Sequence, residues 1–167
     1  MALIPWTRPI ALMVTGIGAM FNATVLQGWP FFRDLRRGPR DVGFITYPAA
    51  LFVAFGLFGA EIGRGAWVEL AVGDWAATYF GMKLGGPTVP WNRRKHWWGA
   101  LAHALLGFVA VWLFSVLVLH ASWDAGRLAG ILAICALVET LVSEGWDNLL
   151  VVVSFSGLAR LVFGPRP

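Results

Sequence analysis

Acidic residues inside or beside long apolar stretches are the first candidates for chemistry in this sequence. Glu69, Asp74 and Glu139 interrupt apolar stretches, and Asp147 opens the last of them. An ionisable group within a membrane span costs about 2.5–3.5 kcal/mol on insertion scales, so it usually faces a cavity or a partner. Carboxylates on separate helices that meet on one side can hold a divalent metal, which can bridge phosphates. We therefore predict that Glu139 and Asp147 can jointly hold a divalent metal, and Asp147 is also a good N-cap for the helix it opens.

A basic block follows the stretch that holds Asp74. It reads N-R-R-K-H over residues 92–96 and comes after Gly85 and Gly86. Clustered cations suit phosphate oxygens, and glycines let backbone amides approach a ligand closely. A basic loop that only sets the orientation of the chain in a membrane has the same composition. The block therefore predicts phosphate binding or topology, and its composition does not separate the two.

Small residues recur at four-residue spacing beside Asp74. Gly73, Ala77 and Gly81 form a stripe at which another helix can approach closely. The stripe predicts that Asp74 points into a bundle of helices. The alternative is a packing helix whose acid pairs with an arginine.

His103 follows His96 by seven residues, which puts both on nearly the same face if the helix starts early. A histidine at such a place serves as a base, a ligand or a hydrogen-bonded packing residue. No cysteine or second close histidine completes a zinc pattern around it.

The composition indicates the elements that must hold these residues. The 167 residues are 58% hydrophobic and 13% charged, whereas soluble domains are about 45–50% apolar and about 25% charged. This excludes a disordered tail, a disulfide scaffold and an ordinary water-soluble enzyme. Apolar stretches cover residues 9–29, 44–60, 66–82, 98–120, 128–142 and 149–163, and a span needs about 20 residues. We predict an all-α, polytopic transmembrane bundle of six spans in a single domain, residues 1–167.

The charges collect in two loops that must share a side of this bundle. Eight of the 13 lysines and arginines lie there, namely Arg33, Arg36, Arg37, Arg40, Lys83, Arg93, Arg94 and Lys95. The positive-inside bias places both loops and the link 143–147 in the cytoplasm, with the N-terminus outside. Asp41 lies on the same side. Short basic blocks between apolar runs indicate topology, so we expect a lipid bilayer and no nucleic acid as partner.

Four blocks of the chain carry a resemblance to a known family. They read R-R-G-P-R-D-V-G-F-I-T-Y-P (36–48), A-V-G-D-W-A-A-T-Y-F-G (71–81), W-N-R-R-K-H-W-W-G-A-L-A (91–102) and V-E-T-L-V-S-E-G-W-D-N-L (138–149). In this order, over residues 36–153, the chain resembles the integral-membrane CTP-dependent lipid kinases. That polyprenol kinase family includes dolichol, phytol and farnesol kinases and related diacylglycerol kinases.

The resemblance implies transfer of the γ-phosphate of CTP to the hydroxyl of a long lipid alcohol, with Mg²⁺ as cofactor. It implies catalytic roles for Asp74, Lys95, Glu139 and Asp147, with the three acids as metal ligands. Contacts to the nucleotide are implied for Asn92, Arg93, Arg94, Lys95 and Asn148. The lipid tail would enter laterally between helices.

The chain also departs from the family pattern. His96 and Trp98 stand where the family usually has serine and glutamate. We also expect the family's first span and its basic, histidine-containing N-terminal motif to be missing. Two other functions therefore stay open: a non-catalytic accessory subunit of a membrane complex or homo-oligomer, and a CTP:phospholipid cytidylyltransferase. The cytidylyltransferase would need a denser acidic motif than one Gly-Asp pair, and release of pyrophosphate rather than CDP would identify it.

Overall fold

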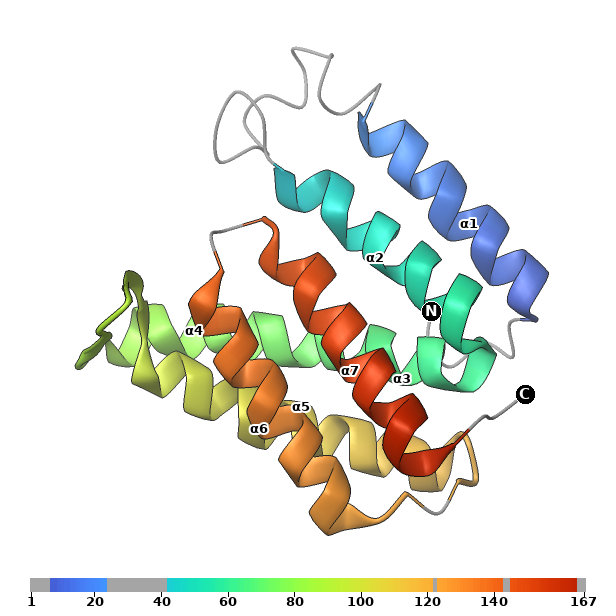
Figure 1. Ribbon diagram of the computed structural model, residues 1–167. Helices are drawn as coiled ribbons and strands as arrows, with labels where there is room; N and C mark the ends of the chain where they lie inside the picture. Colours follow the sequence, from blue (N-terminus) through green and yellow to red (C-terminus); the bar gives the residue numbers. More distant parts are fainter. Residues whose placement is uncertain (1–6, 24–41, 122, 143–144, 165–167) are drawn as a thin grey trace.

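Helices make up almost all of the computed structural model, which describes residues 7–23, 42–121, 123–142 and 145–164 (Figure 1). The helices are α1 (Arg8–Phe21), α2 (Val42–Phe58), α3 (Ala60–Glu69), the π-helix η3 (Leu70–Asp74), α4 (Trp75–Leu84), α5 (Trp97–Leu117), α6 (Ala125–Leu141) and α7 (Asp147–Phe163). The short antiparallel strands β1 (Thr88–Val89) and β2 (Asn92–His96) form a hairpin between α4 and α5. The all-α prediction is confirmed, and the hairpin is an addition in a region predicted only as a loop.

The predicted apolar stretches coincide with helices, with shifted ends. The third stretch, residues 66–82, lies within a longer helical run, α3–η3–α4, that starts at Ala60. The two short stretches at the C-terminal end lengthen at their N-terminal ends into α6 and α7. In the first stretch α1 ends at Phe21, and residues 24–29 lie outside the described residues.

Helix α5 is the one described helix that is long and apolar enough to cross a membrane. It has 21 residues, a mean hydropathy of 2.2, and only 33% of its apolar window is buried in the protein. The apolar helices Arg8–Phe21 and Ile45–Phe58 are shorter. Helix length and composition therefore do not confirm a bundle of six spans.

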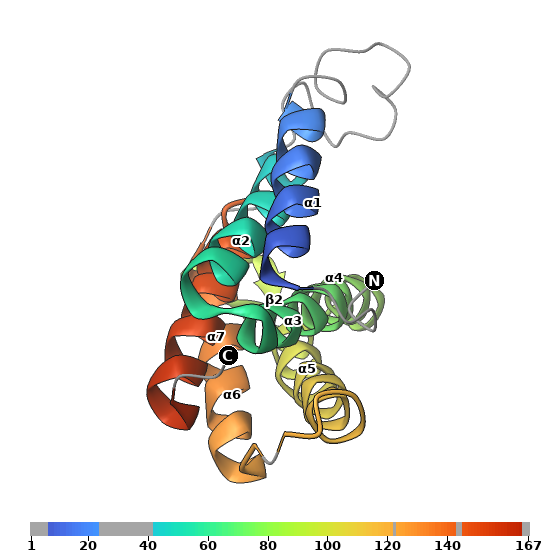
Figure 2. The same cartoon turned by 90° about the vertical axis from the view of Figure 1, so that its right-hand side faces the viewer.

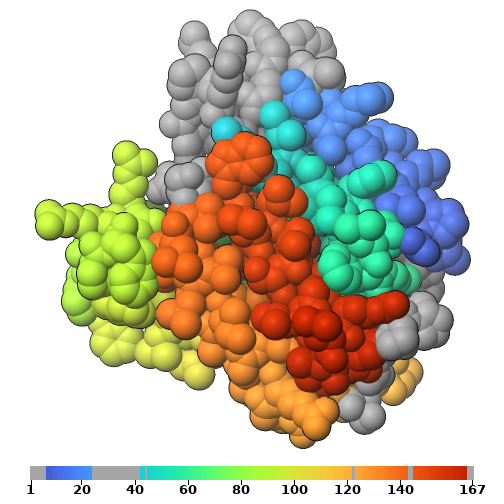
Figure 3. Space-filling view, in the orientation of Figure 1, coloured from blue at the N-terminus to red at the C-terminus, as the bar shows by residue number. Residues whose placement is uncertain are grey.

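The helices pack around one core, in which α2 and α7 run parallel because both begin where Gly145 lies against Val42. α1 lies on α2 at the edge of the bundle, and α2 packs on α7, which packs on α6 (Figures 1 and 2). α5 packs against α6 and against the run α3–η3–α4. In the space-filling view, α7 lies between α6 and α2 (Figure 3). Buried side chains from these helices interlock, among them Leu51, Phe55, Ile62, Leu128, Leu132 and Phe155.

The described connections gather at two opposite ends of the bundle. At one end the Thr46 hydroxyl of α2 donates to the carbonyl oxygen of Gly145, just before α7. Gly145 has φ +93°, and a Cβ there would lie 2.9 Å from Cβ of Val42, so this turn requires glycine. At the other end Arg8 donates to the carbonyl oxygens of Phe55 and Gly56. The basic loop with Arg33, Arg36, Arg37, Arg40 and Asp41 lies outside the described residues, and the orientation of the bundle in a membrane stays a prediction.

A seam of small residues brings α4 and α5 close together. A Cβ added at Gly99 of α5 would lie 2.6 Å from the carbonyl oxygen of Ala77 and 3.3 Å from Cα of Gly81. A Cβ at Gly107 would lie 3.7 Å from Cα of Gly73. The stripe of Gly73, Ala77 and Gly81 therefore meets a second helix, as its spacing predicts.

We predict that Gly99→Ala destabilises the protein, because the added methyl group meets backbone atoms of α4 that no rotamer change can move. Overpacking of this kind costs about 1–3 kcal/mol, which should lower the melting temperature in detergent. Gly130→Ala on α6 is the matched control, since nothing lies within 4 Å of a Cβ there. An alanine there should be neutral or stabilising by up to about 1 kcal/mol. Equal melting temperatures for Gly99→Ala and the parent would contradict the close seam.

Candidate active site

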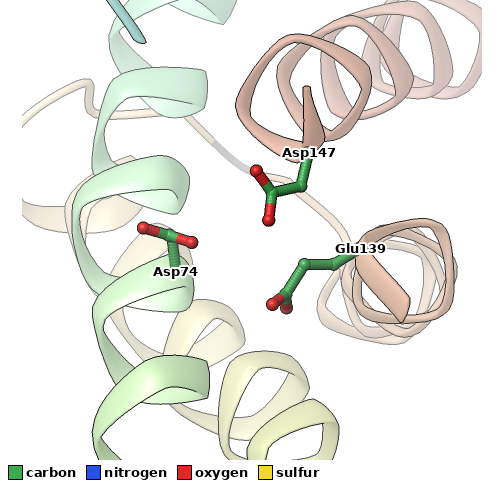
Figure 4. A group of neighbouring side chains, drawn as sticks. All are labelled: Asp74, Glu139 and Asp147. Carbon is green, nitrogen blue, oxygen red and sulfur yellow. The ribbon is translucent and has the colours of Figure 1, made fainter. Parts of the chain in front are cut away.

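Three carboxylates from three parts of the helical bundle meet at the end where α6 and α7 are joined. Asp74 ends η3, Glu139 lies in the last turns of α6, and Asp147 is the first residue of α7. Each offers an oxygen atom, and these atoms lie within 4.8 Å of one another (Figure 4). Glu139 and Asp147 are buried, and Asp74 is partly exposed. Residues up to 73 positions apart along the chain thus form one acidic cluster, which we call the carboxylate cluster.

The Lys95 ammonium group compensates two of these charges. Its Nζ lies 2.6 Å from Oε1 of Glu139 and 2.9 Å from Oδ2 of Asp147. Burial by itself would lower the pKa of Lys95, but the charges of Glu139 and Asp147, and its hydrogen bonds to them, raise that pKa above its ordinary value. Lys95 is therefore a cation throughout the neutral range. Within the described residues it makes no close ion pair with Asp74.

A π-turn sets the direction of Asp74. Regular α-helical geometry, with 3.6 residues per turn, would place Glu69 and Asp74 about 140° apart around the helix axis. Because η3 (Leu70–Asp74) closes its turns on the fifth residue, the two acids come to nearly the same face. Such single-turn π segments are frequent at functional sites. Because Gly73 has no side chain, α5 can pack closely against this segment.

The hairpin holds Lys95 over the cluster. Asn92 Nδ2 donates to the carbonyl oxygens of Thr140 at 3.1 Å and Val142 at 3.2 Å. Trp91 Nε1 donates to Oγ1 of Thr140 at 3.1 Å. The two bonds from Asn92 satisfy carbonyl groups at the end of α6, which have no partner within that helix. The basic block is thus tied to the end of the helix that carries Glu139.

The other residues predicted to contact the nucleotide lie on β2 and at the start of α7. Arg93 and Arg94 are exposed on β2, next to Lys95 in the chain. Asn148 is buried beside Asp147, and its Nδ2 lies 3.5 Å from the carbonyl oxygen of Gly43. Since the amide groups of Asn92 and Asn148 bond to backbone atoms, both residues have a structural use, and their contact to a nucleotide stays a prediction.

Two expectations about local structure are wrong. His96 is the last residue of β2, not part of the helix, so it does not share a helical face with His103. Its Nδ1 donates to the carbonyl oxygen of Gly86 at 3.1 Å. Asp147 is not the N-cap of α7, because that position is Trp146. Oδ1 of Asp147 accepts the backbone N–H groups of Gly145 and Asn148, which leaves Oδ2 for Lys95.

The structure joins a buried histidine to this site, which the spacing of the sequence does not do. His103 on α5 lies 2.7 Å from Glu69 through Nε2 and 2.7 Å from Glu139 through Nδ1. All three side chains are almost fully buried. The only sequence signal was that Glu69 and His103 are ionisable residues within apolar stretches, which need a partner.

Comparison with known proteins identifies relatives of one kind. The chain is 29% identical over 165 residues to probable phytol kinase 3, chloroplastic, of Glycine max. The aligned region covers 90% of this chain and 50% of the relative. It is 26% identical over 174 residues to phytol kinase 1, chloroplastic, of Arabidopsis thaliana, covering 98% of this chain and 57% of the relative. Its curated homologues are phytol kinases. This confirms the family resemblance seen in the four sequence blocks.

The homology has a defined extent. A probable chloroplastic phytol kinase of Triticum aestivum is 28% identical over 181 residues, again 98% of this chain and 57% of the relative. The chain thus spans about half the length of the curated relatives it matches. No family model and no solved structure matches the chain.

We predict that Asn92→Asp loosens the hairpin, since it replaces two donated hydrogen bonds by a carboxylate that faces two carbonyl oxygens. Loss of such bonds costs about 1–3 kcal/mol, so trypsin should cut after Arg93 and Arg94 about tenfold faster. The control is Thr88→Ala, an exposed position on β1, which should leave the rate near that of the parent chain. Equal cleavage rates for the parent chain and both variants would contradict the role of Asn92 in holding the hairpin against the end of α6.

Proposed function

We propose that this chain is a membrane-embedded kinase that transfers the γ-phosphate of CTP to the hydroxyl group of a long-chain lipid alcohol. The carboxylate cluster with Lys95 carries the proposal, because it assembles three of the four family-like blocks at one point. Phosphoryl transfer is mostly positioning and charge neutralisation, which requires cations for the phosphates and carboxylates for metal or hydroxyl. The phytol kinase names of the curated homologues support a lipid alcohol as acceptor.

The donor set of the cluster fits Mg²⁺. Hard oxygen ligands from carboxylates are what this ion prefers, and it commonly binds through one or two of them together with substrate phosphates. Asp74, Glu139 and Asp147 would hold it, with their oxygen atoms within 4.8 Å of one another. When bound, the ion neutralises negative charge on the phosphate oxygens.

The cations of β2 would bind the triphosphate. Lys95 already lies between two carboxylates of the cluster, so a phosphate bound to it would lie next to Asp74. Arg93 and Arg94 are exposed on the same strand and provide the planar, forked donors that suit phosphate oxygens. Asp74, which makes no close ion pair in the described part of the chain, is the carboxylate best placed to accept a hydrogen bond from the acceptor hydroxyl.

The outer surface suits contact with lipid. On α5, Leu105, Val109, Leu113 and Leu117 are 42–66% exposed, and a soluble protein rarely exposes so continuous an apolar face. Exposed apolar side chains also cover α1, including Met13 and Ile17. We propose that helices of the bundle other than α5 also enter the bilayer.

The acceptor would reach the site from the lipid. Trp75 of α4 follows Asp74 directly and is 55% exposed, and it stacks on Tyr79 at a centroid distance of 5.3 Å. A hydrocarbon chain can lie along this aromatic face while its hydroxyl group reaches Asp74. The basic hairpin would then be on the cytoplasmic side, where the positive-inside bias places it.

The decisive experiment incubates the purified protein in liposomes with Mg²⁺, γ-labelled CTP and a panel of phytol, farnesol, dolichol and diacylglycerol. We expect CDP release with transfer of label to an alcohol. Parallel reactions with ATP, GTP and UTP test the preference for cytidine.

Other products would identify the other functions. Pyrophosphate release with a CMP-linked lipid would identify a cytidylyltransferase. No turnover with any donor would refute the kinase proposal and favour an accessory subunit, as His96 and Trp98 in the family's serine and glutamate places suggest. In the structure Trp98 is 47% exposed and lies against Gly86 rather than in the cluster.

We predict that Asp74→Asn lowers the turnover number at least about a hundredfold, since it removes a charge that acts on the reacting groups. The matched control is Asp124→Asn. Asp124 caps α6 by accepting the N–H of Arg127, and asparagine caps equally well, so turnover should stay within about twofold. Unchanged turnover in Asp74→Asn, at equal expression and melting temperature, would remove Asp74 from the mechanism.

A further inference from the structure

A chain of buried polar contacts lies behind the carboxylate cluster, and the proposed reaction does not use it. His103 of α5 and Glu69 of α3 are both 0% exposed. His103 Nε2 lies 2.7 Å from Oε1 of Glu69, and Nδ1 lies 2.7 Å from Oε2 of Glu139. Burial of polar groups is costly unless each has a partner, and here each ring nitrogen atom of His103 faces a carboxylate oxygen.

Glu139 uses its two oxygen atoms for two different partners. Oε1 accepts from Lys95 Nζ at 2.6 Å, and Oε2 accepts from His103 Nδ1 at 2.7 Å. A glutamate side chain has several rotatable bonds, and its freedom must be restricted for a single orientation to persist. Since Oε2 is held from inside the bundle, Oε1 is directed toward the hairpin. The orientation of the carboxylate that faces Lys95 therefore depends on His103.

The imidazole ring is itself held in one orientation. A half-turn of the ring would exchange each nitrogen atom with a carbon and break both contacts. Glu69 anchors Nε2, and Gly73 of η3 lies so close that a Cβ there would be 2.9 Å from this nitrogen. Oε2 of Glu69 has no hydrogen-bond partner among the described residues, so the contact to His103 is the polar bond that Glu69 makes in this part of the protein.

We propose that Glu69 and His103 are positioning residues that hold the Glu139 carboxylate in the orientation in which it binds Lys95. They act through Glu139 and do not touch the reactants. Partners behind a ligand carboxylate typically change affinity or activity about 10- to 100-fold when they are removed. The activity test below rests on the proposed kinase function, whereas the labelling test does not.

Two substitutions of His103 separate its two contacts. The amide nitrogen of asparagine occupies the place of Nδ1, so His103→Asn keeps a donor for Glu139. The amide nitrogen of glutamine reaches the place of Nε2, so His103→Gln keeps a donor for Glu69 only. We expect kcat to fall about 10- to 100-fold in His103→Gln and only a few-fold in His103→Asn, with KM for the alcohol unchanged. Equal losses in both variants, or a larger loss in His103→Asn, would overturn the proposal.

A matched control variant and a pair of Glu69 variants distinguish positioning from a general packing effect. Ser115→Ala removes a buried hydroxyl of the same helix that donates only to the nearby carbonyl oxygen of Trp112, and it should leave kcat unchanged. Glu69→Gln keeps an acceptor for Nε2, whereas Glu69→Ala removes it. Rescue of kcat in Glu69→Gln relative to Glu69→Ala, at similar melting temperatures, is the expected result, and equal kcat values for the pair would contradict it.

A labelling experiment tests the positioning without any turnover. Lys83 and Lys95 are the two lysines of the sequence, so acetic anhydride labelling read by mass spectrometry gives their reactivity ratio with Lys83 as internal reference. Release of Lys95 from an oriented Glu139 should raise its relative rate about tenfold in His103→Gln, the size expected for one charge-assisted hydrogen bond. His103→Asn should stay near the parent value. An unchanged ratio in His103→Gln refutes the positioning role, whereas absence of kinase activity in the parent chain refutes only the proposed function.

Discussion

The need to compensate buried charge is the constraint on which the rest of this structure depends. Four ionisable side chains from different elements cannot share an apolar interior unless each finds a partner of opposite charge or a hydrogen bond. The contacts run from Lys95 to Glu139, from Glu139 to His103 and from His103 to Glu69. They join the hairpin, α6, α5 and α3, so the polar chain also holds the helices in one relative position.

Backbone geometry makes this arrangement possible. Gly99 allows α5 to approach α4, so that His103, one turn further, reaches the π-turn at Gly73. The extra residue of that turn brings Glu69 and Asp74 to nearly the same face. Small residues and an irregular turn, which contribute little packing of their own, thus decide where the acids lie.

Much of the fold and part of the site follow from the sequence because their signals are local. The positions of the apolar stretches predict the helices, and the scarcity of charge directs attention to Asp74, Lys95, Glu139 and Asp147, which the structure brings together. The curated homologues, which are phytol kinases, agree with the family that the motifs suggest. The hairpin at residues 88–96 was not predictable, because a basic glycine-containing segment has no hydrophobic alternation that would indicate strands.

The sequence by itself determined which groups must find partners, since an ionised side chain in an apolar stretch is unfavourable wherever it lies. Only the tertiary structure decided which partners they find. Glu69 and His103 are 34 residues apart and His103 and Glu139 are 36 apart, and no local rule connects such positions. Their pairing follows from the crossing of α3, α5 and α6, which depends on how whole helices pack rather than on the spacing of any single motif.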